Sequence, residues 1–177
     1  RGEIVDRHVG VIGRQAAHVD ARAQALVALD GHAGDALQAA AKSVLDKGDL
    51  FGIYPEGTRS PDGRVYKGRT GLARIAMPSG VPVVLIGMIG SGKANPIGTT
   101  IPRPAKVRIK IPEQIDPHAW AREHGYDPAS REAVRPFTDY CMQRLADMVG
   151  TQYVDVYASD VKKSLEETGE YPEGARP

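Results

Sequence analysis

A short run of residues, Tyr54 to Arg59, has the composition of a site for a polar, anionic ligand. Gly57 lets the backbone approach a ligand closely, because glycine has no side chain. Arg59 can bind a phosphate group through two parallel hydrogen bonds. Glu56 can orient that arginine or accept a hydrogen bond from a hydroxyl group. A solvated turn has the same composition, so the residues alone leave both interpretations open.

The preceding residues predict the element that positions this run. Leu50, Phe51 and Ile53 suit a buried strand, and Pro55 should end it, because proline cannot donate to a sheet ladder. Ligands bind beyond the carboxyl ends of strands in open α/β sheets. Gly71 follows Lys67 and Arg69 and should begin a helix, whose amino-terminus is a second candidate anion site.

The remaining pattern predicts an α/β domain with a mixed, largely parallel sheet wrapped by helices. Residues 1–163 are interpreted as one domain and residues 164–177 as a polar, mobile tail. Strands are expected at residues 2–7, 50–54, 81–87 and 106–111. Helices are expected at residues 14–30, 35–48, 71–78, 116–123 and 130–149, with a last one near residue 161.

Charge is unevenly distributed along the chain of 177 residues, whose net charge is +1. Residues 50–110 contain ten lysines and arginines but only two acids, Glu56 and Asp62, which gives this stretch a net charge of +8. Such a stretch suits a phosphorylated substrate, coenzyme A or an anionic membrane surface. A scattered, solvated basic face is the alternative.

Two further features limit the possible functions. The longest apolar run, residues 81–89, is far shorter than the roughly 20 residues that span a bilayer. The single cysteine, Cys141, cannot form an internal disulfide and is expected to pack in the core. Gly87, Gly92 and Lys93 imitate a nucleotide-binding P-loop, but Ala94 replaces the required Ser or Thr, which argues against a nucleotide site.

The run Tyr54 to Ser60 resembles the Phe/Tyr-Pro-Glu-Gly-Thr-Arg-Ser signature of the glycerolipid acyltransferases, which include the 1-acyl-glycerol-3-phosphate acyltransferases. Weaker matches flank it. Gly2, Ile4 and Arg7 resemble an upstream block of the family, and Lys67 with Gly71 resembles a downstream one. Residues 81–86 resemble a fourth block, in which Leu85 replaces the usual second proline.

The resemblance implies a glycerol-phosphate acyltransferase-like fold. The +8 central stretch, with no spanning segment, predicts a peripheral location at the cytoplasmic face of the cell membrane. The resemblance also implies transfer of an acyl chain from acyl-CoA or acyl carrier protein to lysophosphatidic acid, giving phosphatidic acid. No metal, bound cofactor or nucleic acid is expected. The implied substrate-binding residues are Arg7, Glu56, Gly57, Thr58, Arg59 and Lys67. We expect Arg7, Arg59 and Lys67 to converge around one anion beside Glu56 and Gly57.

The family's catalytic pair, a histidine followed five positions later by an aspartate, is absent from the chain, so no catalytic residue is identified. Five positions after His118 stands Glu123, downstream of the signature, and a solvent-facing helix residue is the preferred interpretation of His118. The chain begins at Arg1 rather than methionine, and we expect the missing pair in residues that precede it. The 177-residue chain alone is then expected to be inactive. The alternative function is a non-catalytic lipid- or phosphate-binding protein of the same fold.

Overall fold

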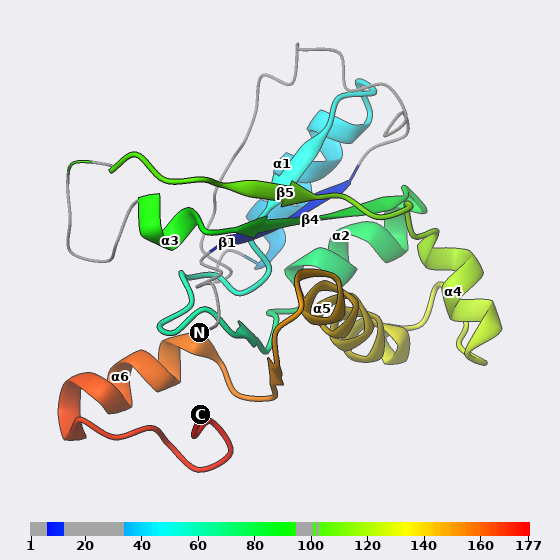
Figure 1. The fold of residues 1–177 in the computed structure, drawn as a ribbon. Coiled ribbons are helices and arrows are strands. Elements are labelled where there is room, and N and C mark those ends of the chain that lie inside the picture. The colour runs from blue at the N-terminus through cyan, green and yellow to red at the C-terminus, as the bar shows by residue number, and fades with distance from the viewer. Residues whose placement is uncertain (1–6, 13–33, 95–100, 102) are drawn as a thin grey trace.

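The computed structural model describes residues 7–12, 34–94, 101 and 103–177 (Figure 1). The predicted helix at residues 14–30 and most of the predicted strand at residues 2–7 lie outside this part. The elements in chain order are β1 (Arg7–Ile12), α1 (Gly34–Leu45), β2 (Phe51–Ile53), β3 (Val65–Tyr66), α2 (Gly71–Ser79), β4 (Val83–Ile89), α3 (Ser91–Ala94), β5 (Arg108–Lys110), α4 (Pro117–Glu123), the 3-10 turn η1 (Arg131–Ala133), α5 (Val134–Val149), β6 (Tyr153–Val154) and α6 (Ala158–Thr168).

A four-stranded sheet with the order β2-β1-β4-β5 forms the centre of the described structure. The α/β class is confirmed, but the predicted largely parallel pairing is wrong for these strands, since every neighbouring pair in this sheet is antiparallel. Among the strands that the structure describes, the small β3–β6 pair alone is parallel. The apolar run of β4 indicates burial on both faces, and burial carries no information about the direction of the neighbouring strand.

The antiparallel pairing gathers several chain segments at one end of the sheet. β1 runs opposite to both β2 and β4, and β5 runs opposite to β4. The carboxyl ends of β2 and β4 therefore meet the amino ends of β1 and β5. Arg7, which pairs with Met88, lies at this end, and so does the signature run that follows Ile53.

Helix α5 supplies the largest share of the helical layer that covers this sheet. Its predicted inward side is confirmed at Phe137, Cys141 and Leu145, which are fully buried. Val134 and Met148 are partly buried against the same core. Burial raises the pKa of the Cys141 thiol well above its usual value, as expected for a cysteine that packs rather than reacts.

Gly87 allows α5 to approach β4. A Cβ atom at this position would overlap Val149 Cγ1 and lie 2.9 Å from Met148 Cε. The glycine of the P-loop-like pattern is therefore explained by packing, since it lies within β4 and not in a loop. Four residues, Ser91–Ala94, form the short helix that follows.

Gly87→Ala is expected to destabilise the protein by about 2–3 kcal/mol, because the added methyl group has no space. Urea unfolding measures this change. The double variant Gly87→Ala/Val149→Ala lacks the Val149 methyl group that the new Cβ would overlap. Its loss of stability should be smaller than the sum of the losses in the two single variants. Additive losses would contradict the proposed contact.

The predicted boundary at residue 163 is wrong, because α6 continues to Thr168. The residues after α6 pack back onto the molecule, and Ala175 is fully buried. It belongs to a second, smaller apolar cluster with Tyr66, Val154 and Val161. The polar composition of residues 164–177 suggested a mobile tail, but Leu165, Tyr171 and Ala175 pack in this cluster, and two backbone carbonyls accept hydrogen bonds from Arg64.

Candidate functional site

The signature run forms a tight turn directly after β2. The Gly57 N–H donates to the Tyr54 carbonyl at 3.0 Å, and Gly57 has a φ of 70°, a conformation that favours glycine. Glu56 is buried and its Oε2 accepts a hydrogen bond of 3.3 Å from the Tyr66 N–H. Glu56 thus connects the turn to β3 in this structure, a contact that sequence reasoning did not anticipate.

Residues from the carboxyl-terminal third of the chain contact two more of the predicted site residues, Thr58 and Lys67. Lys162 Nζ donates to Thr58 Oγ1 at 2.7 Å. Lys67 Nζ forms an ion pair with Asp155 Oδ1 at 2.9 Å and lies over the Tyr157 ring. Pairing of Lys67 with a carboxylate is the arrangement expected if these cations do not share a phosphate.

The predicted convergence of Arg7, Arg59 and Lys67 on one anion stays a prediction. Arg7 and the signature run lie at the same end of the sheet, although through antiparallel rather than parallel pairing. The side chain of Arg7 lies outside the described part of the structure. Arg59 is half-buried in the turn.

A pocket of about 130 Å³ lies at the amino-terminus of α2, beside the signature turn. Its lining consists of Gly34, Gln38, Arg69, Thr70, Gly71, Arg74 and Tyr157, with no acidic residue among them. The Arg69 N–H donates to the Pro55 carbonyl at 2.7 Å, which fixes the pocket to the signature turn. The Arg69 guanidinium lies over the Tyr157 ring and donates to Ser159 Oγ at 3.3 Å.

The chemistry of this pocket suits an anion. The Thr70 side chain makes no capping hydrogen bond to α2, so it does not occupy the N–H groups of the first turn. Arg74 lies one turn further along α2, and its Nη1 is 3.7 Å from the position that a Cβ on Gly34 would take, at the start of α1. Two guanidinium groups and two helix amino-termini thus direct positive charge to one small space.

Local sequence patterns predicted part of this pocket. A helix amino-terminus beside Arg69 was expected as an anion site, and the helix begins at Gly71 as expected. Arg74 stands four positions after Thr70, so it projects from the same side of the first turn. The contributions of Gly34, Gln38 and Tyr157 depend on tertiary contacts and have no local signal.

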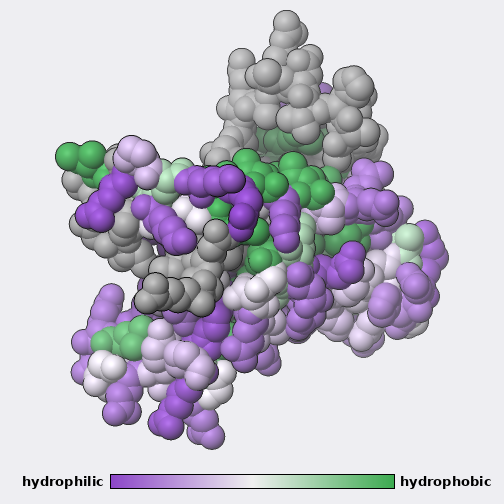
Figure 2. Space-filling view, in the orientation of Figure 1, coloured by the Kyte–Doolittle hydropathy of each residue, from purple (hydrophilic) through white to green (hydrophobic). Residues whose placement is uncertain are grey.

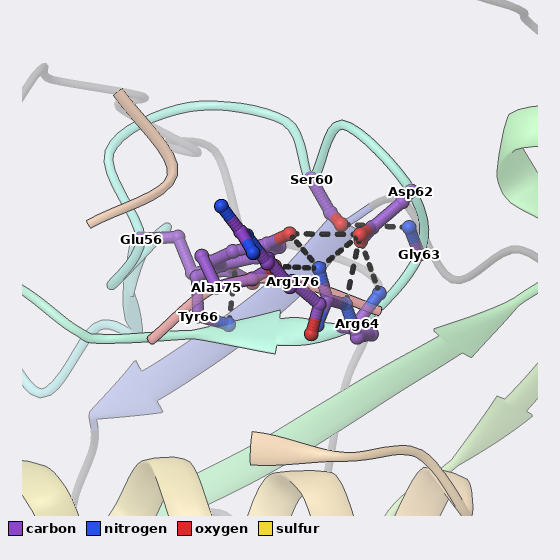
Figure 3. A network of polar contacts seen from close by, with 8 residues as sticks. All are labelled: Glu56, Ser60, Asp62, Gly63, Arg64, Tyr66, Ala175 and Arg176. Carbon is purple, nitrogen blue, oxygen red and sulfur yellow. Dashed lines mark hydrogen bonds and ion pairs between the residues drawn. The ribbon is translucent and has the colours of Figure 1, made fainter. Parts of the chain in front are cut away.

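A network of polar contacts connects the loop that follows the signature turn with the end of the chain (Figure 3). The Arg64 guanidinium donates hydrogen bonds to Asp62 Oδ2 and to the Tyr66 hydroxyl. A third hydrogen bond, of 2.6 Å, goes to the Ala175 carbonyl. The guanidinium also donates to the Arg176 carbonyl at 3.2 Å. Arg64 thereby holds the end of the chain against the loop that follows the signature. Sequence reasoning missed this role, because the partners are more than a hundred positions apart.

Two opposing effects set the acidity of Asp62. Burial raises the pKa of a carboxyl group, but hydrogen bonds from Arg64 and Tyr66 and the charge of Arg64 outweigh it, so the pKa of Asp62 lies below its usual value. Burial, together with the neighbouring carboxylate, raises the pKa of the Tyr66 hydroxyl above its usual range. Asp62 therefore carries its charge at neutral pH and Tyr66 does not.

Neither histidine in the carboxyl-terminal half is placed as a base for the signature turn. His118 is half-buried, not solvent-facing as predicted, and its Nε2 lies 2.6 Å from the Met77 carbonyl. His124 Nδ1 lies 2.8 Å from the Trp120 carbonyl, within its own helix end. The described residues include no group of three or more His, Cys, Asp or Glu side chains that could hold a metal ion. Every helix in the described ranges is too short or too polar to traverse a bilayer.

Comparison with known families agrees with the signature. Residues 16–89 match the family described as Acyltransferase. This part of the chain is therefore similar to part of an acyltransferase domain, and the matching relatives are named 1-acyl-sn-glycerol-3-phosphate acyltransferases.

The individual relatives that match the chain carry a more specific name. A chloroplastic 1-acyl-sn-glycerol-3-phosphate acyltransferase of Brassica napus is 45% identical over 56 residues, which cover 32% of this chain and 16% of the relative. A chloroplastic enzyme of the same name from Arabidopsis thaliana is 40% identical over 73 residues, covering 41% of this chain and 20% of the relative. One from Limnanthes alba is 30% identical over 84 residues, covering 48% and 30%. The matched part thus spans less than a third of each relative, and no solved structure matches the chain.

Proposed function

We propose that this protein takes part in phospholipid synthesis, as an acyltransferase that converts lysophosphatidic acid to phosphatidic acid. The observation that carries the proposal is the signature Tyr54 to Ser60, placed in a turn directly beside an arginine-lined pocket at the start of α2. The names of the relatives support lysophosphatidic acid as the acceptor. The acyl donor is acyl-CoA or acyl carrier protein, and no metal or bound cofactor enters the proposed reaction.

In the proposed reaction, the free hydroxyl oxygen of the acceptor attacks the thioester carbonyl carbon of the donor. The carbon–sulfur bond breaks, and the proton lost by the hydroxyl group ends on the departing sulfur. Within this chain, Arg69 and Arg74 would bind the acceptor's phosphate at the amino-terminus of α2. Glu56 and Gly57 would shape the adjacent turn through the contacts described above. The general base is not assigned to any residue of this chain.

The protein is proposed to work at a membrane surface, because its acceptor and product are lipids. A peripheral location at the cytoplasmic face of the cell membrane stays part of this proposal. The Brassica and Arabidopsis relatives are named as chloroplastic proteins, so the particular membrane does not follow from them. The +8 charge of residues 50–110 supports an anionic surface.

Acyl transfer to lysophosphatidic acid tests the function directly. The 177-residue chain is expected to bind the acceptor but to show no turnover with acyl-CoA or acyl carrier protein, because it lacks a His-x4-Asp pair. The complete gene product should show turnover if it supplies that pair. Transfer by the 177-residue chain at the rate of the complete product would contradict the assignment of catalysis to that pair.

A non-catalytic lipid- or phosphate-binding protein is the alternative function. The absence of a His-x4-Asp pair from the chain favours it, since binding needs only the pocket and the signature turn. If the complete gene product binds lysophosphatidic acid but fails to transfer an acyl group from either donor, this alternative is correct.

A further inference from the structure

One exposed segment, Ile101 together with residues 103–111, combines apolar and basic side chains, and we call it the β5 arm. The large apolar side chains that stand most exposed among the described residues all belong to it. Their exposed fractions are 78% for Ile101, 41% for Val107, 62% for Ile109 and 59% for Ile111. Figure 2 shows apolar surface at the tip of this arm and along the upper side of the sheet, with hydrophilic side chains between.

The charged residues of the β5 arm all have one sign. Arg103, Lys106, Arg108 and Lys110 alternate with the apolar residues, and no acidic residue lies between Ile101 and Ile111. All four cations lie in exposed positions. An anionic partner with an apolar layer beneath its charges complements both properties.

The two faces of β5 differ in their surroundings. Lys110 pairs with Gly87, on the face covered by α5, and its Nζ donates to the Met148 carbonyl at 2.7 Å. Ile109 pairs with Met88, so these two side chains share the opposite face. Ile109 and the half-buried Met88 therefore extend the apolar surface from the arm onto the sheet.

A second copy of the chain fits this edge less well than a lipid surface. β5 is an edge strand, and lysines and arginines on an edge strand oppose pairing with another strand. Antiparallel pairing of β5 with itself would place like charges opposite one another. An anionic bilayer would instead attract Arg103 and Lys106, which precede β5, and cover the isoleucines.

We propose that the β5 arm docks the protein onto an anionic lipid bilayer, with its isoleucines in the interface and with Arg103 and Lys106, which precede β5, at the headgroups. This inference deepens the membrane location proposed above and rests on it. The arm begins at the same end of the sheet as the signature turn, as the strand directions require. A lipid acceptor held at that end would therefore lie near the docked surface.

Vesicle co-sedimentation of the 177-residue chain tests the inference, with phosphatidylglycerol or phosphatidylcholine vesicles at low and high salt. Arg103→Gln/Lys106→Gln should weaken binding to phosphatidylglycerol roughly 25-fold at low salt, about fivefold for each cation, and reduce the salt dependence. Ile109→Ser/Ile111→Ser should weaken binding about tenfold and keep the salt dependence. The control Lys47→Gln/Arg122→Gln removes the same charge from exposed sites outside the arm, and should change binding less than twofold.

Each outcome decides the matter. Equal losses for the control pair and the arm pair would overturn the role of the arm, while membrane association itself would stand. If the unmodified chain does not prefer phosphatidylglycerol to phosphatidylcholine vesicles, both the role of the arm and the association with anionic membranes are wrong. If Ile109→Ser/Ile111→Ser instead converts a dimer to a monomer in sedimentation velocity and leaves vesicle binding unchanged, the arm binds a second copy and the inference is wrong. None of these readouts depends on acyl transfer, so the proposed chemistry is judged separately.

Discussion

Replacing Arg69 or Arg74 with glutamine is expected to lower the affinity for lysophosphatidic acid tenfold to about a hundredfold. Each change removes one charge-assisted contact to the phosphate, which typically contributes about 1.5–3 kcal/mol. Isothermal titration with a short-chain lysophosphatidic acid, below its micelle concentration, measures the effect. Binding of the matching monoacylglycerol, which lacks the phosphate, should not change.

Two further variants locate the anion. Arg122→Gln removes an exposed arginine of α4 outside the pocket and should leave the affinity unchanged within about twofold, since exposed distant charges are screened. Lys67→Gln tests the competing site at Lys67, which the structure pairs with Asp155. A loss confined to Lys67→Gln would place the phosphate there and contradict the pocket at α2.

Replacing Arg64 with alanine is expected to destabilise the protein by about 3 kcal/mol. The change leaves the mostly buried Asp62 carboxylate without its cation, and leaves the Ala175 and Arg176 carbonyls without this donor. Urea unfolding measures the loss of stability. Limited proteolysis should show earlier cleavage after Glu173, because the end of the chain is no longer held.

Controls separate this effect from ordinary charge removal. The Lys42–Asp46 pair has a similar distance, 2.6 Å, but both side chains are largely exposed. Lys42→Ala should therefore cost less than about 0.5 kcal/mol. The double variant Asp62→Ala/Arg64→Ala should recover part of the loss, because no buried charge remains unpaired. A loss in Arg64→Ala no greater than in Lys42→Ala would contradict the proposed role.

The same pair gives a pH dependence. Because the pKa of Asp62 is lower in the folded protein than in the unfolded chain, its stabilisation is fully present above the unfolded value of about 4. It is lost as the pH falls through the folded pKa. The difference in the free energy of unfolding between the unmodified protein and Arg64→Ala should therefore become smaller as the pH is lowered from 5 toward 2.

Local sequence patterns were enough to predict the resemblance to the acyltransferase signature and the main elements that carry it. Seven consecutive residues, Tyr54 to Ser60, define the motif, and Pro55 correctly predicted the end of β2. The buried side of α5 was readable because helix periodicity records which residues face the core. The apolar run of β4 likewise recorded burial. These features are local, and side-chain chemistry encodes them within a few positions.

The pairing of the strands and the contacts between distant residues depend on the tertiary fold and have no local signal. Burial patterns do not specify strand direction, so the antiparallel order β2-β1-β4-β5 was not readable. Arg64 and Ala175 stand 111 positions apart, and Thr58 and Lys162 stand 104 apart. No spacing rule connects such residues, because their contacts form only when the carboxyl-terminal helix packs onto the signature loop. The candidate anion pocket combines a locally predicted residue with one that the fold places. Arg69 was expected beside the start of a helix, whereas only tertiary contacts bring Arg74 against α1.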